Sequence, residues 1–227
     1  MKTVLITGAN RGIGLAMVQQ ALEAGDEVIA TCRRPEEAER ILPQHERLRW
    51  VALDVTDETS IAALAKQLDD IGVDVLINNA GTYGPKGVPL GEVEAEPWLE
   101  VFRTNTIGPL LVTQAMLPAL RRGSERKIAF VSSKVGSIDD NGSGGSYLYR
   151  SSKTALNQVM KSVSVDLSEE GFVVLALHPG WVQTRMGGPN ALIDTDTSAR
   201  GLLRVIQDST PEQSGRFFNY DGSTIPW

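Results

Sequence analysis

A tyrosine and a lysine four residues apart form the pair best suited to chemistry in this sequence. Tyr149 and Lys153 lie in YLYRSSK, which opens a segment with helical spacing. Residues four apart on a helix share one face, at about 5–6 Å between Cβ atoms. A free phenol has a pKa of about 10, and a neighbouring ammonium favours the phenolate. The pair predicts acid–base catalysis, with Tyr149 as the proton donor; the alternative is two ordinary surface side chains.

Two neighbours in the same stretch are weaker candidates for this role. Tyr147 has Ser151 as its partner four residues on, and a serine cannot supply charge. We therefore interpret Tyr147 as a loop or packing aromatic. Arg150 is expected to point away from the Tyr149 face, into solvent or an interface.

The elements that position these residues can be predicted from the sequence. Short apolar runs, which are strand candidates, alternate with segments of helical spacing. The six strand candidates are KTVLIT, EVIAT, LRWVALD, VDVLIN, RKIAFVS and FVVLALH. Several are apolar on both faces, which is typical of a parallel sheet buried between helices. Helices are expected over 13–24, 57–70, 97–121 and 147–169. The pattern predicts an α/β fold, a doubly wound parallel sheet with helices on both faces and ligands at the carboxyl ends of the strands.

A glycine cluster, TGANRGIG at 7–14, follows the first strand candidate and opens the first helix candidate. Gly8, Gly12 and Gly14 permit a tight turn and a close approach of backbone to a pyrophosphate. The alternative is a plain strand-to-helix turn, which also needs one or two glycines. A P-loop is excluded because no Gly-Lys-Ser/Thr ends the loop. The cluster predicts a nucleotide site.

The glycine cluster resembles that of the short-chain dehydrogenase/reductase family, and four further motifs stand in the same order. They are Asp54-Val55, Asn78-Asn79-Ala80-Gly81, Tyr149 with Lys153, and Pro179-Gly180 with Thr184. Together the motifs span most of the chain. The resemblance implies a single-domain Rossmann-type fold over 1–227 and an oxidoreductase activity.

The resemblance also implies which residues hold a dinucleotide. Asp54 would receive the adenine amino group, Thr184 the nicotinamide carboxamide, and Lys153 the ribose hydroxyls. For Asp54 the alternative is a turn or helix-cap acid that competes with Asp57. The full set expected to bind the cofactor is Gly8, Asn10, Arg11, Gly12, Ile13, Gly14, Arg33, Asp54, Val55, Asn79, Ala80, Gly81, Tyr149, Lys153, Pro179, Gly180, Val182 and Thr184.

The family also uses a serine and an asparagine beside the tyrosine. The usual count of thirteen residues before Tyr149 arrives at Gly136, so the loop here is longer by three. Ser133 matches the family pattern at the end of the fifth strand and is our candidate for orienting the substrate oxygen, with Ser137 and Ser132 as alternatives. Asn105 matches the family asparagine that holds a proton-relay water; the alternative is a buried helix asparagine bonded to backbone.

The choice of cofactor depends on the end of the second strand. An acidic residue there normally binds the adenosine ribose and repels a 2′-phosphate. Here the strand ends in Thr31-Cys32-Arg33-Arg34, with no acid before Glu36. Two guanidiniums, Arg33 and Arg11, suit a phosphate. We therefore predict NADP(H), with NAD(H) possible if these arginines are ordinary surface residues.

The longer loop and the ending FFNYDG are most similar to the C-factor and sniffer-type carbonyl reductase branch of the family. That branch implies an NADPH-dependent carbonyl reductase for small aldehydes or ketones. The alternative function is a dinucleotide-binding signalling protein with slow or incidental turnover. A nucleotide-sugar epimerase is disfavoured, because it needs a longer segment after Thr184. A short substrate lid is expected at about 185–195.

Composition narrows the remaining possibilities. The chain has 227 residues, 41% hydrophobic and 22% charged, which is typical of a globular domain. A net charge of −6 gives no basic footprint, so no nucleic-acid partner is expected. The single cysteine, Cys32, fits a reducing compartment and is expected to be a small buried residue. We expect a cytoplasmic homodimer or homotetramer with no metal and no membrane span.

Overall fold

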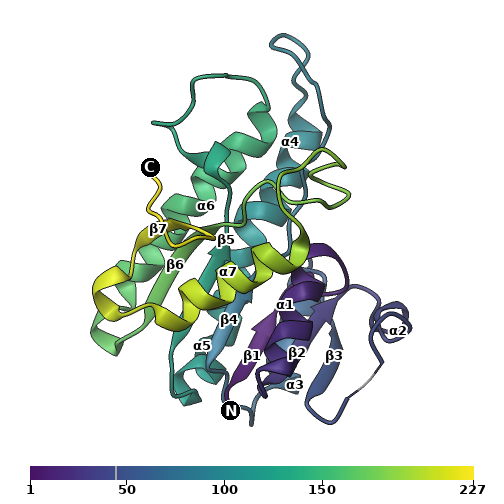
Figure 1. Ribbon diagram of the computed structural model, residues 1–227, viewed down its shortest axis with the longest axis vertical. Helices are drawn as coiled ribbons and strands as arrows, with labels where there is room; N and C mark the ends of the chain where they lie inside the picture. Colours follow the sequence, from purple (N-terminus) through teal and green to yellow (C-terminus); the bar gives the residue numbers. More distant parts are fainter. Residues whose placement is uncertain (44) are drawn as a thin grey trace.

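The computed structural model describes residues 1–43 and 45–227, and its centre is one seven-stranded sheet (Figure 1). The strands are all parallel, in the order β3-β2-β1-β4-β5-β6-β7. Their bounds are β1 Thr3–Ile6, β2 Glu27–Cys32, β3 Leu48–Ala52, β4 Val75–Asn78, β5 Lys127–Val131, β6 Val173–His178 and β7 Arg216–Asn219. The predicted α/β, doubly wound fold is confirmed.

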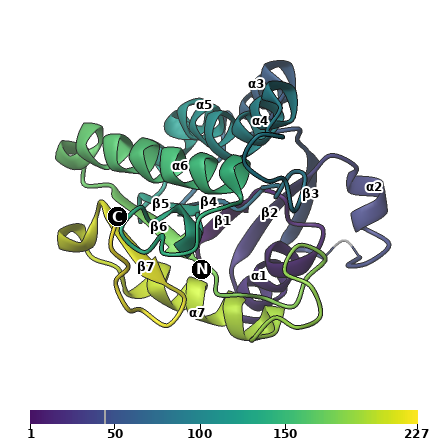
Figure 2. The same cartoon turned by 90° about the horizontal axis from the view of Figure 1, so that it is seen from above.

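Helices cover both faces of the sheet (Figure 2). The α-helices are α1 Gly12–Glu23, α2 Pro35–Ala38, α3 Glu58–Gln67, α4 Ala95–Phe102, α5 Gly108–Arg122, α6 Tyr147–Asp166 and α7 Thr195–Asp208. A π-helical turn, η1 Arg103–Ile107, joins α4 to α5, and three 3₁₀ turns are η2 Lys134–Gly136, η3 Ser168–Glu170 and η4 Pro211–Gln213. Helices α1 and α7 pack together on one face, and α3, α5 and α6 lie on the other.

The sheet divides the core into two apolar layers. In β1, Val4 and Ile6 face the α1 and α7 side, whereas Leu5 faces the opposite side. This alternation follows from the two-residue repeat of a strand. All three side chains are almost fully buried. Strands that are apolar on both faces are therefore explained by burial under both layers, as the sequence predicted.

Two elements at the end of the chain were not predicted. Strand β7 has only four residues, and its Phe217 and Phe218 enter the two different core layers. Helix α7 begins at Thr195, which the sequence analysis had assigned to the lid. The Asp194 carboxylate caps this helix by accepting from the Thr197 N–H at 2.7 Å. The helix thus starts at the last residue of the segment expected to form the lid, at about 185–195.

The single helix expected over 97–121 is interrupted. Its π-helical turn, η1, contains Asn105 at its centre. Single π-helical turns occur frequently at functional sites. The other three expected helices match α1, α3 and α6, although α6 ends at Asp166 because a 3₁₀ turn follows.

Candidate active site

The candidate site lies where the loops after β1 and β4 meet. These strands are neighbours in the sheet although they are not consecutive in the chain, so the loops that follow them share the carboxyl edge. Gly8 has a φ of +64°, and a Cβ added there would lie 2.8 Å from Ala80 Cα. A side chain at Gly14 would lie 2.6 Å from Asn79 Nδ2. Only glycines permit the two loops to pack this closely.

A set of hydrogen bonds fixes the same two loops to each other. The Thr7 hydroxyl accepts from the backbone N–H groups of Asn79 and Ala80, both at 3.0 Å. The Asn79 side chain donates to the carbonyls of Thr7 and Gly8, at 2.9 and 3.1 Å. Asn79, predicted to border a cofactor, thus also holds the glycine loop in its turn. Thr7 was not predicted to take part.

The start of α1 is suited to an anion. Arg11 occupies the N-cap position with extended backbone, and no side chain among the described residues caps the helix there. The first N–H groups of the helix therefore remain available to a ligand and carry the positive end of the helix dipole. A cradle with close-packed glycines and open N–H groups fits the pyrophosphate of a dinucleotide.

Three arginines gather beside this helix start. The pKa of Arg11 is below its usual value because of partial desolvation and because the guanidiniums of Arg185 and Arg33 lie nearby. All three residues are exposed, whereas the adjacent Arg34 forms an ion pair with Glu37 at 2.6 Å. Two guanidiniums close to Arg11 make the potential here positive, which favours an anionic ligand. Arg185 was not predicted to be part of this cluster.

Asp54 lies two residues after β3, near Arg33. Its carboxylate accepts from the backbone N–H and the hydroxyl of Thr56, at 2.9 and 2.7 Å. Desolvation alone would raise the pKa of Asp54, but the Thr56 hydrogen bonds and the charge of Arg33 lower it below its usual value. Asp54 forms the turn considered as its alternative role, while Asp57 caps α3. An ionised acid here remains available to accept from an amino group.

Lys153 and Tyr149 share one face of α6, as the spacing predicted. The Lys153 ammonium lies 5.8 Å from the centre of the Tyr149 ring and donates to the Val131 carbonyl at 2.8 Å. Lys153 is almost fully buried, at 4% exposure, and this burial lowers its pKa to about 8. The ammonium is therefore held at the end of β5, directly beside the tyrosine.

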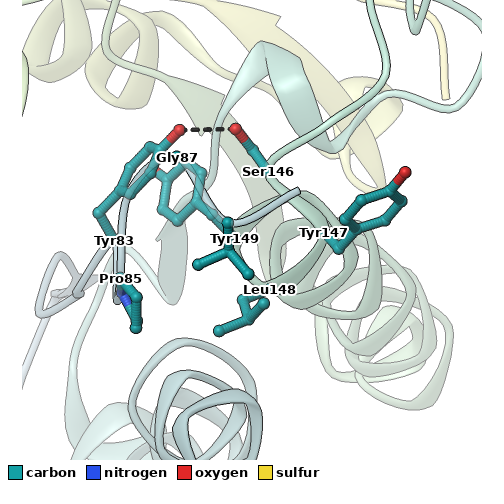
Figure 3. Close-up of a pocket in the computed structure, with 8 residues that line it drawn as sticks. Tyr83, Pro85, Gly87, Ser146, Tyr147, Leu148 and Tyr149 are labelled. Carbon is teal, nitrogen blue, oxygen red and sulfur yellow. Dashed lines mark hydrogen bonds between the residues drawn. The ribbon is translucent and has the colours of Figure 1, made fainter. Parts of the chain in front are cut away.

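The environment of Tyr149 keeps it protonated, whereas the sequence led us to expect that the Lys153 ammonium would lower its pKa. Desolvation raises the pKa of the phenol to about 12, and a hydrogen bond with the Ser133 side chain opposes this rise. Tyr83 also raises the Tyr149 pKa, and its ring stacks on the Tyr149 ring with 4.6 Å between centroids (Figure 3). A protonated phenol beside a hydroxyl and an ammonium can donate a proton to a ligand oxygen.

The three candidate serines have different surroundings. Ser133 follows β5 and reaches Tyr149, as described above. Ser132 instead donates to Asn157 Oδ1 at 2.6 Å inside the fold. Ser137 donates to the Trp227 carbonyl at 3.2 Å. Only Ser133 of these three lies against the tyrosine, whereas Ser132 and Ser137 are engaged in packing the surrounding chain.

Asn105 connects the loop after β4 to α6. It is fully buried in the π-helical turn, and its Oδ1 accepts from the Thr82 N–H at 2.8 Å. Its Nδ2 donates to the Thr82 carbonyl at 2.8 Å and to the Ser152 hydroxyl at 3.0 Å. These contacts match the alternative of a buried asparagine bonded to backbone. They also bring Asn105 near Gly81 and Lys153, since a Cβ on Gly81 would lie 3.3 Å from Asn105 Oδ1 and 3.6 Å from Lys153 Nζ.

The segment after β6 lies across the glycine loop. Thr184 accepts from the Gly187 N–H at 3.1 Å, and its methyl group would be 3.3 Å from a Cβ on Gly12. An isolated bridge between Val182 and Ile193 closes the base of the segment. The predicted lid is therefore a closed loop that contacts the start of α1.

The family of this chain follows from its sequence together with this geometry. A model of the short chain dehydrogenase family matches residues 2–192. The chain belongs to the short-chain dehydrogenase/reductase family. As a short-chain dehydrogenase/reductase it is an oxidoreductase, as its motifs predicted.

Individual relatives support the same family. C-signal of Myxococcus xanthus is 54% identical over 155 residues, which are 68% of this chain and 93% of that protein. The structure of carbonyl reductase Sniffer of D. melanogaster superimposes with a TM-score of 0.94, at 36% identity and with full coverage of both chains. The NADPH-bound carbonyl reductase from chicken fatty liver gives a TM-score of 0.92 and 37% identity, covering 100% of this chain and 99% of that one.

Two residues around this short-chain dehydrogenase site need comment. Arg150 was expected to point away from the Tyr149 face, into solvent or an interface, and it is half-buried. Its guanidinium donates to the carbonyls of Val135 and Gly144, at 3.1 and 3.2 Å, and thereby holds the loop before α6. His178, the last residue of β6, is mostly buried, and desolvation lowers its pKa to about 4.

Sequence reasoning missed the aromatic and cationic residues that frame the site. Tyr83 stands two residues after the Asn-Asn-Ala-Gly motif, and its position in that loop was the only available signal. Lys86 in the same loop donates to the Met186 carbonyl of the lid at 2.9 Å.

Among the described residues, no cluster of three or more His, Cys, Asp or Glu could hold a metal ion. No helix in the described parts of the chain is long and apolar enough to cross a membrane.

Proposed function

We propose that this chain is an NADPH-dependent carbonyl reductase that acts on small aldehydes or ketones. The observation that carries the proposal is the convergence of Tyr149, Lys153 and Ser133 at the carboxyl edge of the sheet, beside the glycine loop. A proton donor with a nearby cation and hydroxyl is the arrangement that carbonyl reduction requires.

Each residue has a defined task in the reduction. When bound, the reduced nicotinamide supplies a hydride to the substrate carbon. The Ser133 hydroxyl orients the substrate oxygen, and Tyr149 donates its proton to that oxygen to complete the alcohol. The Lys153 ammonium stabilises the phenolate that remains. Asn105 fixes the loop after β4 against α6 and thereby helps to hold Tyr149 and Lys153 in position.

The arginine cluster supports NADPH as the preferred cofactor. Arg11 and Arg33 would hold the 2′-phosphate, because guanidiniums bind phosphate oxygens with charge-assisted hydrogen bonds. The chicken relative is bound to NADPH. The remaining cofactor contacts are those predicted from the sequence, with Asp54 at the adenine and Thr184 at the nicotinamide. NAD(H) would be the weaker cofactor.

A second candidate function is a signalling protein that binds a dinucleotide and turns over slowly. The observation that favours it is the 54% identity to C-signal of Myxococcus xanthus. The reductase remains our first proposal, because Tyr149 has both the Lys153 ammonium and the Ser133 side chain beside it.

We also propose one domain over 1–227, with a short substrate lid at about 185–195. The cytoplasmic location and the homodimer or homotetramer stay predictions from the sequence.

The test is consumption of NADPH and NADH by the purified protein with a panel of aldehydes, ketones and dicarbonyls. Cofactor binding is recorded in parallel by fluorescence. We expect turnover with NADPH on at least one carbonyl and slower turnover with NADH. Tight cofactor binding without turnover on the whole panel would contradict the reductase and favour the signalling protein. Faster turnover with NADH would contradict the cofactor assignment alone.

A further inference from the structure

Tyr83 covers one face of the proposed catalytic tyrosine. The rings of Tyr83 and Tyr149 are stacked, with centroids 4.6 Å apart and an interplanar angle of 22° (Figure 3). Tyr83 comes from the loop between β4 and α4, so it reaches the site from outside α6. Stacked aromatic pairs stabilise each other by about 0.5–1.5 kcal/mol beyond their buried area. The contact therefore fixes the orientation of the Tyr149 ring.

Tyr83 is itself held at two points. Its hydroxyl forms a hydrogen bond of 2.8 Å with the Ser146 hydroxyl (Figure 3). Ser146 has a φ of +48°, in the left-handed region that non-glycine residues seldom adopt. Such backbone is retained where the surroundings enforce it, often at functional sites. The Lys86 ammonium lies 5.3 Å from the Tyr83 ring and reaches the lid through the Met186 carbonyl.

We propose that Tyr83 is a positioning residue for Tyr149, which it holds in place and shields from water while Ser146 holds Tyr83. The inference rests on the proposed function of Tyr149 and deepens it. A ring stacked flat on the tyrosine leaves the hydroxyl free for Ser133 and for a carbonyl oxygen. It also keeps water away from the site of proton transfer, where a dry environment strengthens each electrostatic contact.

Several groups face Tyr149, and the test must distinguish the effect of Tyr83 from the effects of the others. Lys153 faces it from α6, the Ser133 hydroxyl from the end of β5, and Tyr83 from the loop after β4, with Lys86 behind it. Only Tyr83 supplies a flat apolar surface. Tyr147 is the matched control, because it lies on the same helix turn and points away from the stacked pair (Figure 3).

The experiment is a pH titration of ¹³Cζ-tyrosine signals by NMR in the cofactor-free protein. The chain has four tyrosines, so Tyr149→Phe assigns the signal of Tyr149. We expect Tyr83→Ala to lower the pKa of Tyr149 by about one unit or more, because water reaches its hydroxyl. Tyr83→Phe keeps the stacked ring but loses the hydrogen bond to Ser146, so we expect a smaller decrease in the Tyr149 pKa than in Tyr83→Ala. Tyr147→Ala should leave the Tyr149 pKa unchanged.

The outcomes decide the inference independently of turnover. An unchanged Tyr149 pKa in Tyr83→Ala, or an equal decrease in Tyr147→Ala, would overturn it. Tyr83→Leu replaces Tyr83→Ala if the alanine variant does not fold, with the same expected direction. A wild-type protein that reduces no carbonyl would defeat the proposed function, yet the titration would still report whether Tyr83 sets the environment of Tyr149.

Discussion

At the scale of single residues, burial moves Tyr149 and Lys153 toward their neutral forms. Desolvation raises the phenol pKa to about 12 and lowers the ammonium pKa to about 8. Removing a charge from water is costly. The buried phenol therefore keeps its proton to a higher pH, and the buried ammonium loses its proton at a lower pH. At neutral pH the pair therefore consists of a protonated phenol and a charged ammonium. The proposed carbonyl reduction requires these two protonation states.

The buried charge of Lys153 predicts a pH-dependent cost to stability. Its pKa is 10.5 in an exposed lysine and about 8 here, so the folded protein disfavours the ammonium by about 3 kcal/mol below pH 8. As pH rises from about 8 to 10.5, the folded lysine loses its proton and this cost disappears. Cofactor-free Lys153→Met should therefore be more stable than the wild type at pH 7, by up to about 3 kcal/mol.

Urea unfolding of both proteins between pH 7 and 10 measures this prediction. The advantage of Lys153→Met should shrink as pH rises above 8, since only the wild type gains stability there. An advantage that stays constant with pH would contradict a buried ammonium.

Arg33 predicts the choice between the two cofactors. Hydrogen bonds to charged groups contribute about 1.5–3 kcal/mol, so Arg33→Asp should weaken NADPH binding by about tenfold to hundredfold. NADH binding should weaken little. Arg34→Asp is the matched control, because Arg34 is paired with Glu37 and points to no cofactor in our proposal. Equal effects of the two variants on the ratio of NADPH to NADH affinity would argue against the arginine cluster as a phosphate site.

The sequence indicated the residue types of the site better than their contacts. The four-residue spacing placed Tyr149 and Lys153 on one face of α6, because helix geometry depends only on spacing. The serine was ambiguous, since a loop lengthened by three residues removes the usual count. Tyr83 could not have been predicted, because its contact with Tyr149 depends on the path of the loop after β4.

At the scale of elements, the site depends on how closely the loops after β1 and β4 approach. Gly14 lies at the start of α1, where an added Cβ would come within 2.6 Å of Asn79 Nδ2. Asn79 in turn holds Thr7 and Gly8 by hydrogen bonds. The close packing of the two loops therefore requires a glycine at position 14, whether or not a ligand is bound.

Gly14→Ala should therefore disturb the loop and lower the affinity for cofactor. We expect destabilisation of about 1–3 kcal/mol from the forced overpacking. Gly142→Ala is the control, because a Cβ there meets nothing within 4 Å and its backbone is not left-handed. Thermal unfolding and cofactor titration of both variants measure the difference. Equal stability and equal cofactor affinity of the two variants would show that the close approach of the loops after β1 and β4 does not contribute to either.

Periodicity located most elements and failed where elements are short or irregular. The six longer apolar runs all became strands, because buried parallel strands need continuous apolar sequence. β7 escaped notice because its sequence, RFFN, has only two apolar residues, fewer than any of the six predicted runs. The π-helical turn at Asn105 keeps helical spacing on both sides, so spacing alone cannot reveal it.

At the scale of the whole molecule, the end of the described chain supports the loop that leads into α6. Trp227 stacks on Phe217 of β7 with 5.8 Å between ring centroids. Its carbonyl accepts from the Asp139 N–H at 2.9 Å and from the Ser137 hydroxyl at 3.2 Å. The far edge of the sheet is thus connected to the segment that precedes Ser146 and α6.

Trp227→Ala should loosen this segment. We expect a loss of about 0.5–1.5 kcal/mol from the aromatic pair, with faster hydrogen exchange over 137–146. Trp227→Phe retains a ring and should retain most of the protection. Exchange over 137–146 that is unchanged in Trp227→Ala would contradict the connection.

The central claim is that Tyr149 donates the proton in carbonyl reduction. Its most direct test compares the wild type with Tyr149→Phe, using NADPH and the best carbonyl substrate, with cofactor affinity measured on both. General acid catalysis contributes about 10²–10⁴-fold, so turnover should fall by at least about a hundredfold while NADPH affinity stays within about threefold. Turnover retained in Tyr149→Phe would contradict the account and assign the proton to another group.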